Sequence, residues 1–390
     1  MPTHKMAQNN EKLRALLNKI ATEQGYSNYE LIINQISSGG ANYTSKLYTA
    51  VIKETSTTDL HLFAKVGIMR EQETSKIYKT ERFAYTELAK IYNTLQDQHQ
   101  MIDEERLVFS KFYGCDASAF KEMIVLEDLT HKGYQSYDRF KSMEWEYASS
   151  AINELAKLHS LSFAHAANYP KEFSRILMDT KQDRTSEAME SLLNSMAVTA
   201  LSAVRAENKE RLRKHLENVQ DMFVKFFMPL KRSVLIHYDY RPSNLMHRVS
   251  EDGKIEIKIV DLQTLQGGSP VVDLLYFIFT GSDEQFRAAH YHQLVDHYYE
   301  QLSRAMRGLH LDPDTTYSRE DFDYELKEKL PFGLTIAVFA LPVVTVEEEN
   351  APKVNEDLDI ASFFVKKTSD LYTERLNGVV NDYVKWGILK

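Results

Sequence analysis

Four polar residues in the second half of the chain have types and spacings that suit chemistry on a phosphate. His237, Asp239 and Asn244 form the pattern H-x-D-x-x-x-x-N, and Asp261 follows at the end of an apolar run. Read alone, such a pattern is a polar turn between two strands. The β-prone hairpin that carries Asp261 back to the loop makes a chance match improbable, so the pattern favours a catalytic loop paired with a metal-binding loop.

Each residue of this group has a predicted role. Asp239 would accept the proton of an attacking hydroxyl, and phosphoryl transfer needs that hydroxyl aligned. Asn244 and Asp261 would supply the hard oxygen ligands that Mg²⁺ prefers. His237 would hold the loop through backbone hydrogen bonds. Asp273, near the start of the next helical segment, would brace the loop rather than react.

A glycine-containing turn in the first half is a candidate cover for the phosphates of ATP. Gly39 and Gly40 are followed by Asn42 just before a β-prone run. Glycines let backbone amides approach phosphate groups closely. On its own the segment is a plain turn, and the phosphate-covering interpretation depends on the rest of the pattern.

A lysine and a glutamate would complete the nucleotide site. Lys65 lies in a β-prone segment, where a kinase lysine contacts the α- and β-phosphates and is held by a helical glutamate. Glu81 fits that partner, and Glu73 and Glu87 are alternatives. Without a partner, Lys65 would be an exposed strand lysine and Glu81 part of a solvated helix face.

The apolar run Met123–Leu126 leads into an acidic stretch that is a candidate hinge. In a hinge, adenine would hydrogen-bond to backbone groups at Glu127 and Leu129. The alternative is that the stretch is only the end of a strand with solvated acidic residues.

The elements that must position these residues fall into two regions. Up to Leu129 short β-prone runs predominate, and after it helical spacing predominates around a small hairpin. We therefore predict an α+β, bilobal fold: residues 1–129 form a β-rich, nucleotide-covering lobe, and residues 130–390 form a helix-rich lobe that is catalytic and binds the substrate. The expected helices are Glu11–Gln24, Phe83–Leu95 and Trp145–Phe163, and the expected strands are Leu47–Lys53, Leu60–Val66, Leu107–Tyr113, Met123–Leu126, Val234–Ile236 and Ile255–Ile259.

The composition excludes several classes of protein. The 390 residues carry a formal net charge of −9, which argues against a nucleic-acid binder. Cys115 is the single cysteine, so no disulfide forms within the chain and cytoplasmic residence is expected. Met1–Leu16 lacks a signal-peptide pattern, and Leu334–Val344, among the longest apolar runs, is too short to cross a membrane. We expect a monomer with no membrane partner.

Taken together, these segments resemble the ecdysteroid kinase-like family, which is related to choline kinases and aminoglycoside phosphotransferases. The resemblance covers roughly Ile33 to Leu371. It implies a protein-kinase-like fold and an ATP- and Mg²⁺-dependent kinase of small-molecule alcohols. The activity best characterised in such proteins is phosphorylation of an ecdysteroid hydroxyl, as by an ecdysteroid 22-kinase, which inactivates or stores the hormone. The segments that carry the resemblance are Gly40-Ala-Asn42-Tyr43, Val125–Leu129, Leu155–His159, His237–Asn244, Val260–Gln263 and Gly268–Asp273.

Other functions remain open. The acceptor would be an ecdysteroid, a xenobiotic alcohol, or choline or ethanolamine. The apolar segment Phe332–Val344, with the aromatic residues Tyr276, Phe277 and Phe279, would line a steroid cleft or form core. A protein kinase is disfavoured, since no Ala-Pro-Glu segment follows Asp261. A pseudokinase that serves as a binding module is disfavoured because Lys65, Asp239, Asn244 and Asp261 are all present.

Overall fold

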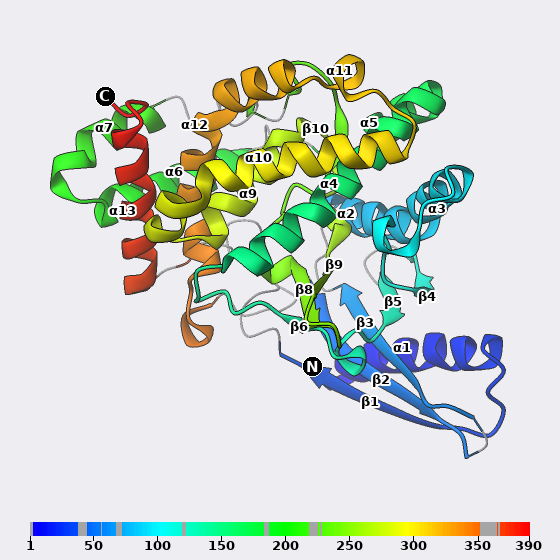
Figure 1. Cartoon of the computed structure of the whole chain (residues 1–390). Coiled ribbons are helices and arrows are strands. Elements are labelled where there is room, and N and C mark those ends of the chain that lie inside the picture. Colours follow the sequence, from blue (N-terminus) through cyan, green and yellow to red (C-terminus); the bar gives the residue numbers. More distant parts are fainter. Residues whose placement is uncertain are drawn as a thin grey trace.

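A five-stranded antiparallel sheet occupies the first third of the chain, in the order β1-β2-β3-β5-β4 (Figure 1). Its strands are β1 (Glu30–Ile36), β2 (Ser45–Lys53), β3 (Leu60–Gly67), β4 (Phe112–Asp116) and β5 (Met123–Glu127). The computed structural model describes residues 3–37, 45–55, 57–67, 72–118, 122–182, 187–217, 225–226, 228–351, 365 and 367–390. Gly39, Gly40 and Asn42 lie outside this described part.

Two of these strands differ from the prediction. β1 was not predicted, because its side chains are partly or fully exposed and show no clear alternation. The strand expected from Leu107 begins only at Phe112. The side chain of Gln96 binds both backbone groups of Leu107, accepting from its N–H at 2.6 Å and donating to its carbonyl at 3.2 Å. Residue 107 therefore satisfies its backbone without a neighbouring strand.

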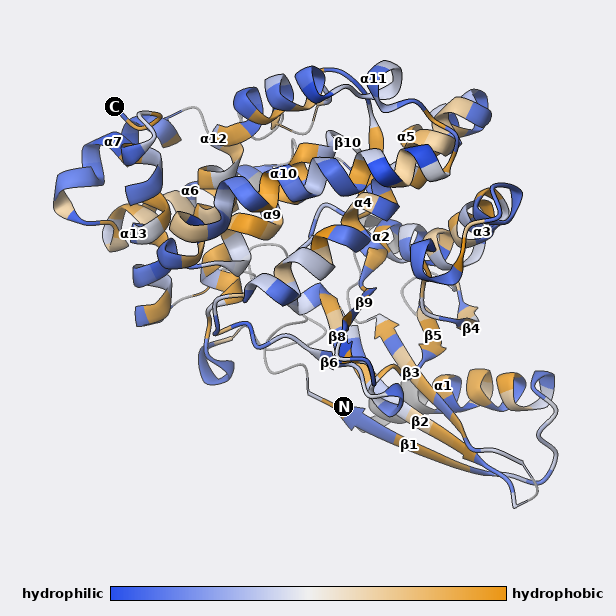
Figure 2. Cartoon of the chain, viewed as in Figure 1, coloured by the Kyte–Doolittle hydropathy of each residue, from blue (hydrophilic) through white to orange (hydrophobic). Residues whose placement is uncertain are grey.

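Helices pack against the hydrophobic residues of this sheet. Helix α1 (Thr3–Glu23) buries Leu13, Leu17 and Ile20 in a cluster with residues of β2, β3 and β5. The hydrophobic colouring of β2 and β3 in Figure 2 matches this burial. A second helical segment consists of α2 (Gln72–Phe83), a π-helical turn (Ala84–Leu88) and α3 (Ala89–Gln98).

The rest of the chain is mainly helical, with two small sheets between the helices (Figure 1). Strands β7 (Val234–Ile236) and β10 (Gln266–Gly268) pair with each other, and β6 (Gln135–Ser136), β8 (Leu245–Val249) and β9 (Ile255–Ile259) form the order β6-β8-β9. The larger helices are α4 (Trp145–Asn168), α5 (Pro170–Thr180), α6 (Glu187–Ala203), α7 (Ala206–Leu216), α9 (Pro270–Gly281), α10 (Glu284–Gly308), α12 (Arg319–Val344) and α13 (Asp370–Lys385), with a short α11 (Pro313–Thr316). Within the described ranges, no helix has the length and apolarity needed to span a bilayer.

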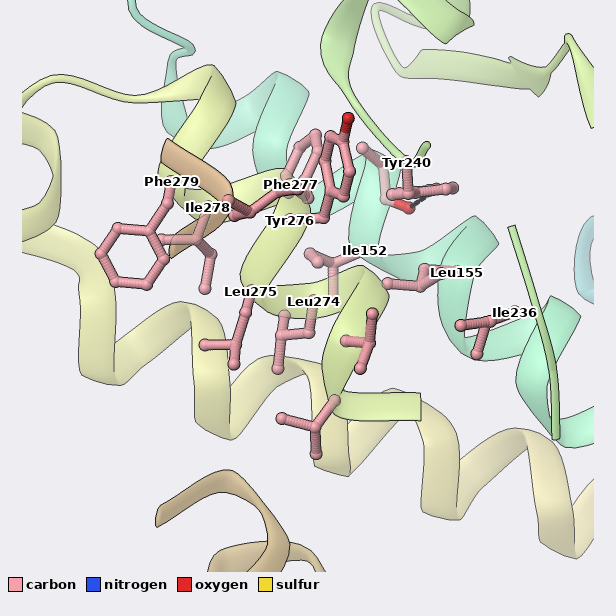
Figure 3. Close-up of a cluster of buried hydrophobic side chains, with 14 of the residues drawn as sticks. Ile152, Leu155, Ile236, Tyr240, Leu274, Leu275, Tyr276, Phe277, Ile278 and Phe279 are labelled. Carbon is pink, nitrogen blue, oxygen red and sulfur yellow. Dashed lines mark hydrogen bonds between the residues drawn. The ribbon is translucent and has the colours of Figure 1, made fainter. Parts of the chain in front are cut away.

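Helix α9 is the centre of the core, since all of its residues are buried. Figure 3 shows its apolar side chains together with Ile152 and Leu155 of α4 and with Tyr240 of the loop after β7. Burying one such side chain contributes about 1.5–3 kcal/mol. The loop between β7 and β8 is thereby anchored to the buried core.

We expect Gly333→Ala to lower stability by about 1–3 kcal/mol, the usual cost of overpacking a core. A Cβ at Gly333 in α12 would lie 2.3 Å from the Phe279 ring and 2.4 Å from the Tyr383 hydroxyl. Urea unfolding measures the loss. Gly308→Ala is the matched control, because a Cβ there meets nothing within 4 Å. Equal unfolding midpoints for the two variants would contradict the expectation.

Candidate active site

The loop between β7 and β8 carries the H-x-D-x-x-x-x-N pattern and is held by one buried acid. Asp273, in the first turn of α9, accepts from the backbone N–H of His237 at 2.6 Å and of Tyr238 at 2.8 Å. The same carboxylate lies 3.2 Å from Nε2 of His159, whose Nδ1 is 2.7 Å from the Tyr298 hydroxyl. Asp273 and His159 are fully buried. The prediction that Asp273 braces the loop is confirmed, and His159 serves packing and hydrogen bonding.

His237 fixes the other side of the loop. Its Nε2 donates to the carbonyl of Val260 at 2.9 Å, and its Nδ1 accepts from the N–H of Asp239 at 3.3 Å. The predicted structural role of His237 is thus confirmed. Tyr238, which lies between His237 and Asp239 in the sequence, has a φ of 71°, a left-handed conformation that is uncommon outside glycine. The two hydrogen bonds to Asp273 hold this backbone in place.

Three side chains orient the carboxylate of Asp239. The Nδ2 of Asn244 donates to its Oδ2 at 2.8 Å and to its backbone carbonyl at 2.9 Å. The Nε of Arg241 lies 3.2 Å from Oδ2 and 3.1 Å from Oδ1. The hydroxyl of Tyr276 is the third group and donates a hydrogen bond to Asp239. Burial raises the pKa of Tyr276, and the charge of Asp239 raises it further. The carboxylate is fixed in direction while its side chain remains 20% exposed, as a base must be to reach a substrate.

Arg241 was not predicted as a site residue, and Tyr276 was considered only as an aromatic lining for a steroid cleft. Arg241 is two positions after Asp239 in the same short loop, so the sequence alone could have predicted that Arg241 lies close to Asp239. Tyr276 comes from α9, and only the packing of α9 against the loop brings it to Asp239.

A lysine joins the two halves of the site. The Nζ of Lys65 in β3 is 2.8 Å from Oε1 of Glu81 in α2 and 2.6 Å from Oδ1 of Asp261, which follows β9. The Lys65 side chain is 9% exposed and that of Glu81 1%. Of the candidate partners, the structure therefore brings Glu81 to Lys65, while Glu87 is exposed.

Burial and charge act against each other in this triad. Burial alone would lower the pKa of Lys65, but Asp261 and Glu81 raise it. For Asp261, the charge and hydrogen bond of Lys65 outweigh burial and hold its pKa below the usual range. For Glu81, burial is the larger effect and raises the pKa despite the neighbouring ammonium. Asp261 is therefore ionised at neutral pH.

The residues present fit the predicted magnesium ion. The backbone carbonyl of Asn244 accepts from the N–H of Val260 at 3.0 Å, which keeps Asn244 next to Asp261. Because Nδ2 of Asn244 faces Asp239, its Oδ1 is left for another partner. One carboxylate and one amide oxygen suit Mg²⁺ when phosphate and water oxygens complete its shell. In the described part of the chain, no group of three or more His, Cys, Asp or Glu residues forms an all-protein metal site.

The candidate hinge is tied by its own side chains. The N–H of Glu127 donates to the carbonyl of Lys111 at 2.9 Å, and its carboxylate accepts from the N–H of Lys111 and pairs with Lys132. The carbonyl of Leu129 accepts from the N–H groups of Lys132 and Tyr134. A nucleotide base would therefore have to use the carbonyl of Glu127 or the N–H of Leu129, and both contacts remain predictions.

The family model of the ecdysteroid kinase-like family matches residues 39–311, well over half of the chain. The chain belongs to the ecdysteroid kinase-like family. The match ends before α12 and α13, so it is shorter than the resemblance expected up to Leu371. No curated protein matches the sequence significantly.

Two solved structures show how far the likeness to other kinases extends. An aminoglycoside 3'-phosphotransferase of type VIII is 13% identical, with a TM-score of 0.38, covering 79% of this chain and 96% of that one. The GDP complex of wild-type aminoglycoside 2'-phosphotransferase-IIIa is 11% identical, with a TM-score of 0.43, covering 94% and 96%. At these values the likeness says nothing about ligands of this ecdysteroid kinase-like chain.

Membership of the ecdysteroid kinase-like family confirms the predicted class of fold. The chain is an α+β protein of the bilobal, protein-kinase-like type, with the antiparallel sheet in its N-terminal part and helices in its C-terminal part. The family and the site together support an ATP-dependent small-molecule kinase.

Proposed function

We propose that this protein transfers the γ-phosphoryl group of ATP to an alcohol, with an ecdysteroid hydroxyl as the first candidate acceptor. The observation that carries the proposal is the carboxylate of Asp239, oriented by Asn244 and Arg241 at 2.8–3.2 Å next to the ion-paired Lys65, Glu81 and Asp261. Asp239 accepts the proton of the hydroxyl as the oxygen attacks. The arrangement suits phosphoryl transfer, in which the protein positions the groups and balances charge.

The remaining roles follow from position. Lys65 binds the α- and β-phosphates and is held by Glu81, while Asn244 and Asp261 hold magnesium. Bound magnesium would neutralise charge that develops on the phosphate oxygens. We also propose that Gly39, Gly40 and Asn42 cover the phosphates and that Glu127 and Leu129 bind adenine.

The steroid assignment rests on the family rather than on a visible cleft. The segment Phe332–Val344 was one candidate lining, but in α12 nearly all of its residues are buried core. Phe277 and Phe279 are fully buried as well. Of Tyr276, Phe277 and Phe279, only Tyr276 interacts with Asp239, so it is the residue of this set that we assign to the acceptor pocket.

A phosphorylation assay tests the proposal. The purified chain is incubated with ATP and Mg²⁺ and with ecdysone, 20-hydroxyecdysone, choline, ethanolamine or a panel of plant-derived alcohols. We expect an ecdysteroid phosphate, identified by mass spectrometry. Phosphorylation of choline alone would overturn the steroid assignment, and turnover of plant alcohols alone would favour a detoxification kinase. Nucleotide binding without turnover of any acceptor would favour a pseudokinase.

We further propose that the protein acts as a cytoplasmic monomer. Light scattering after size-exclusion chromatography tests the monomer, and imaging of a tagged chain tests the location.

We expect Arg241→Gln to lower kcat by about 10²-fold, the usual effect of removing one preorganised donor near developing charge. Arg241 is bonded to Asp239, and its charge also helps to lower the pKa of Asp261. The guanidinium therefore acts on both the proposed base and the proposed metal ligand. Steady-state kinetics and nucleotide binding are compared with those of Arg213→Gln, a change in an exposed ion pair. An unchanged kcat in Arg241→Gln would contradict this role.

A further inference from the structure

A cavity of about 980 Å³ lies where α13 meets the N-terminal ends of α7 and α10. Its walls include Arg205, Asp283, Glu284, Arg375 and Gly378, and none of the residues proposed for phosphoryl transfer lines it. In Figure 1, α13 stands beside the ends of α6 and α7 at one extreme of the molecule, well away from the five-stranded sheet. The cavity therefore has no role in the proposed phosphoryl transfer.

One wall of the cavity contains a buried arginine with an unsatisfied donor. Arg375 is only 3% exposed, and its Nε has no hydrogen-bond partner among the described residues. Its Nη1 lies 3.5 Å from the carbonyl of Thr280 at the end of α9, a long contact to a neutral group. None of the ion pairs in the described part of the chain includes Arg375, and burial lowers its pKa. The charges of Asp283 and Glu374 raise the pKa again, but neither acid forms an ion pair with Arg375, and a buried charge without a direct partner is costly.

A second buried guanidinium lies close by. Arg287 is 2% exposed and binds Asp382 at 2.6 Å and the carbonyl of Ser282 at 2.7 Å, but its Nη2 has no partner among the described residues. A Cβ on Gly378, which lines the cavity, would lie 3.4 Å from that Nη2. The positive charges of Arg287 and Arg375 also act on each other. Of these two buried guanidinium groups, only that of Arg287 pairs with a buried carboxylate, Asp382.

The acids on the rim act on Arg375 through their charge, but none of them forms an ion pair with it. Asp283 caps α10 by accepting from the N–H of Phe286 at 2.7 Å, and Glu284 pairs with Lys385 at 2.6 Å. Asp370 and Glu374 also line the cavity. Together they would repel a ligand with several negative charges. The guanidinium of Arg375, which has no ion-pair partner, favours an anion, and the acidic rim favours an anion with a single charge.

We propose that this cavity is a second ligand site, for a small organic molecule that carries a single carboxylate. The planar carboxylate matches the guanidinium fork of Arg375, which lines the cavity. The volume leaves room for an organic body beyond the carboxylate, against Ala203 and Ala288. The ligand binds here whether or not ATP or an acceptor is present.

Isothermal titration with benzoate and acetate tests the site, with inorganic phosphate and chloride as comparison anions at constant ionic strength. We expect saturable binding of benzoate by the wild-type chain, without ATP or Mg²⁺. Arg375→Gln is expected to weaken it about 10- to 100-fold, the usual effect of losing a charged hydrogen bond. Arg375→Lys keeps the charge but loses the planar guanidinium fork, and we expect it to weaken binding as well. Arg213→Gln, in an exposed ion pair, should bind as the wild type does.

Several outcomes would overturn the proposal: no saturable benzoate binding by the wild type, equal binding by Arg375→Gln, or tighter binding of phosphate than of either carboxylate. Thermal melts show whether the Arg375 variants fold. If they do not, a crystal structure of the wild type with benzoate decides, because the carboxylate must contact Arg375. The assay needs no turnover, so it is independent of the proposed kinase reaction.

Discussion

Replacing Asp239 with alanine is expected to lower kcat by about 10²–10⁴, the usual contribution of a general base. Its carboxylate is the group that Asn244 and Arg241 orient toward the acceptor. Removing it also leaves the buried guanidinium of Arg241 without its observed carboxylate. Nucleotide affinity should change far less than kcat, because Lys65 and Asp261 remain. Acceptor phosphorylation measured by mass spectrometry, together with nucleotide titration, separates the two effects.

The matched control is Asp252→Ala. Asp252 is an exposed aspartate in the turn between β8 and β9, where it binds Lys254 and Ser250. Its loss should leave turnover unchanged. Full activity in Asp239→Ala, with the control also active, would refute the assigned base.

Asp273→Ala should cost about 3–5 kcal/mol of folding free energy, as breaking a buried charged contact commonly does. The variant leaves the backbone N–H groups of His237 and Tyr238 and the ring of His159 without their acceptor, in a place that water does not reach. The same change releases the loop that carries Asp239, so kcat should fall too. Urea unfolding monitored by circular dichroism gives the stability, and the phosphorylation assay gives kcat.

Two further variants sharpen this test. Asp273→Asn keeps one carbonyl acceptor, so its loss of stability should be smaller than that of alanine. Asp296→Ala removes an exposed ion pair with Arg319 and should change stability by at most about 0.5 kcal/mol. An Asp273→Ala chain as stable as Asp296→Ala would mean that the loop does not depend on this acid.

Local sequence was enough to find the residues that one short loop holds together. Asp239, Asn244 and His237 lie within eight positions, so the chain itself keeps them close. The paired strands β2 and β3 were equally predictable, because a polar turn joins two β-prone runs. The spacing of Asp261 from the loop followed from the hairpin of β8 and β9.

Long-range packing decided what the sequence left open. The choice of Glu81 over its alternatives depends on how α2 rotates against the sheet, which periodicity alone does not fix. The contact of Tyr276 with Asp239 needs α9 to cross the loop. The start of β4 was misplaced because Gln96, from another element, satisfies the backbone at Leu107. The buried, unsatisfied Nε of Arg375 had no sequence signal at all, since its isolation exists only in the folded chain.

Tyr238 shows how one backbone angle limits what the sequence can become. Its left-handed conformation costs about 1–3 kcal/mol for a residue with a side chain, whereas glycine adopts it freely. Chains with glycine between the histidine and the aspartate of this loop need no such compensation. The hydrogen bonds to Asp273 offset this cost at Tyr238. Loss of the acid is therefore expected to lower stability more in this chain than in one with glycine at position 238.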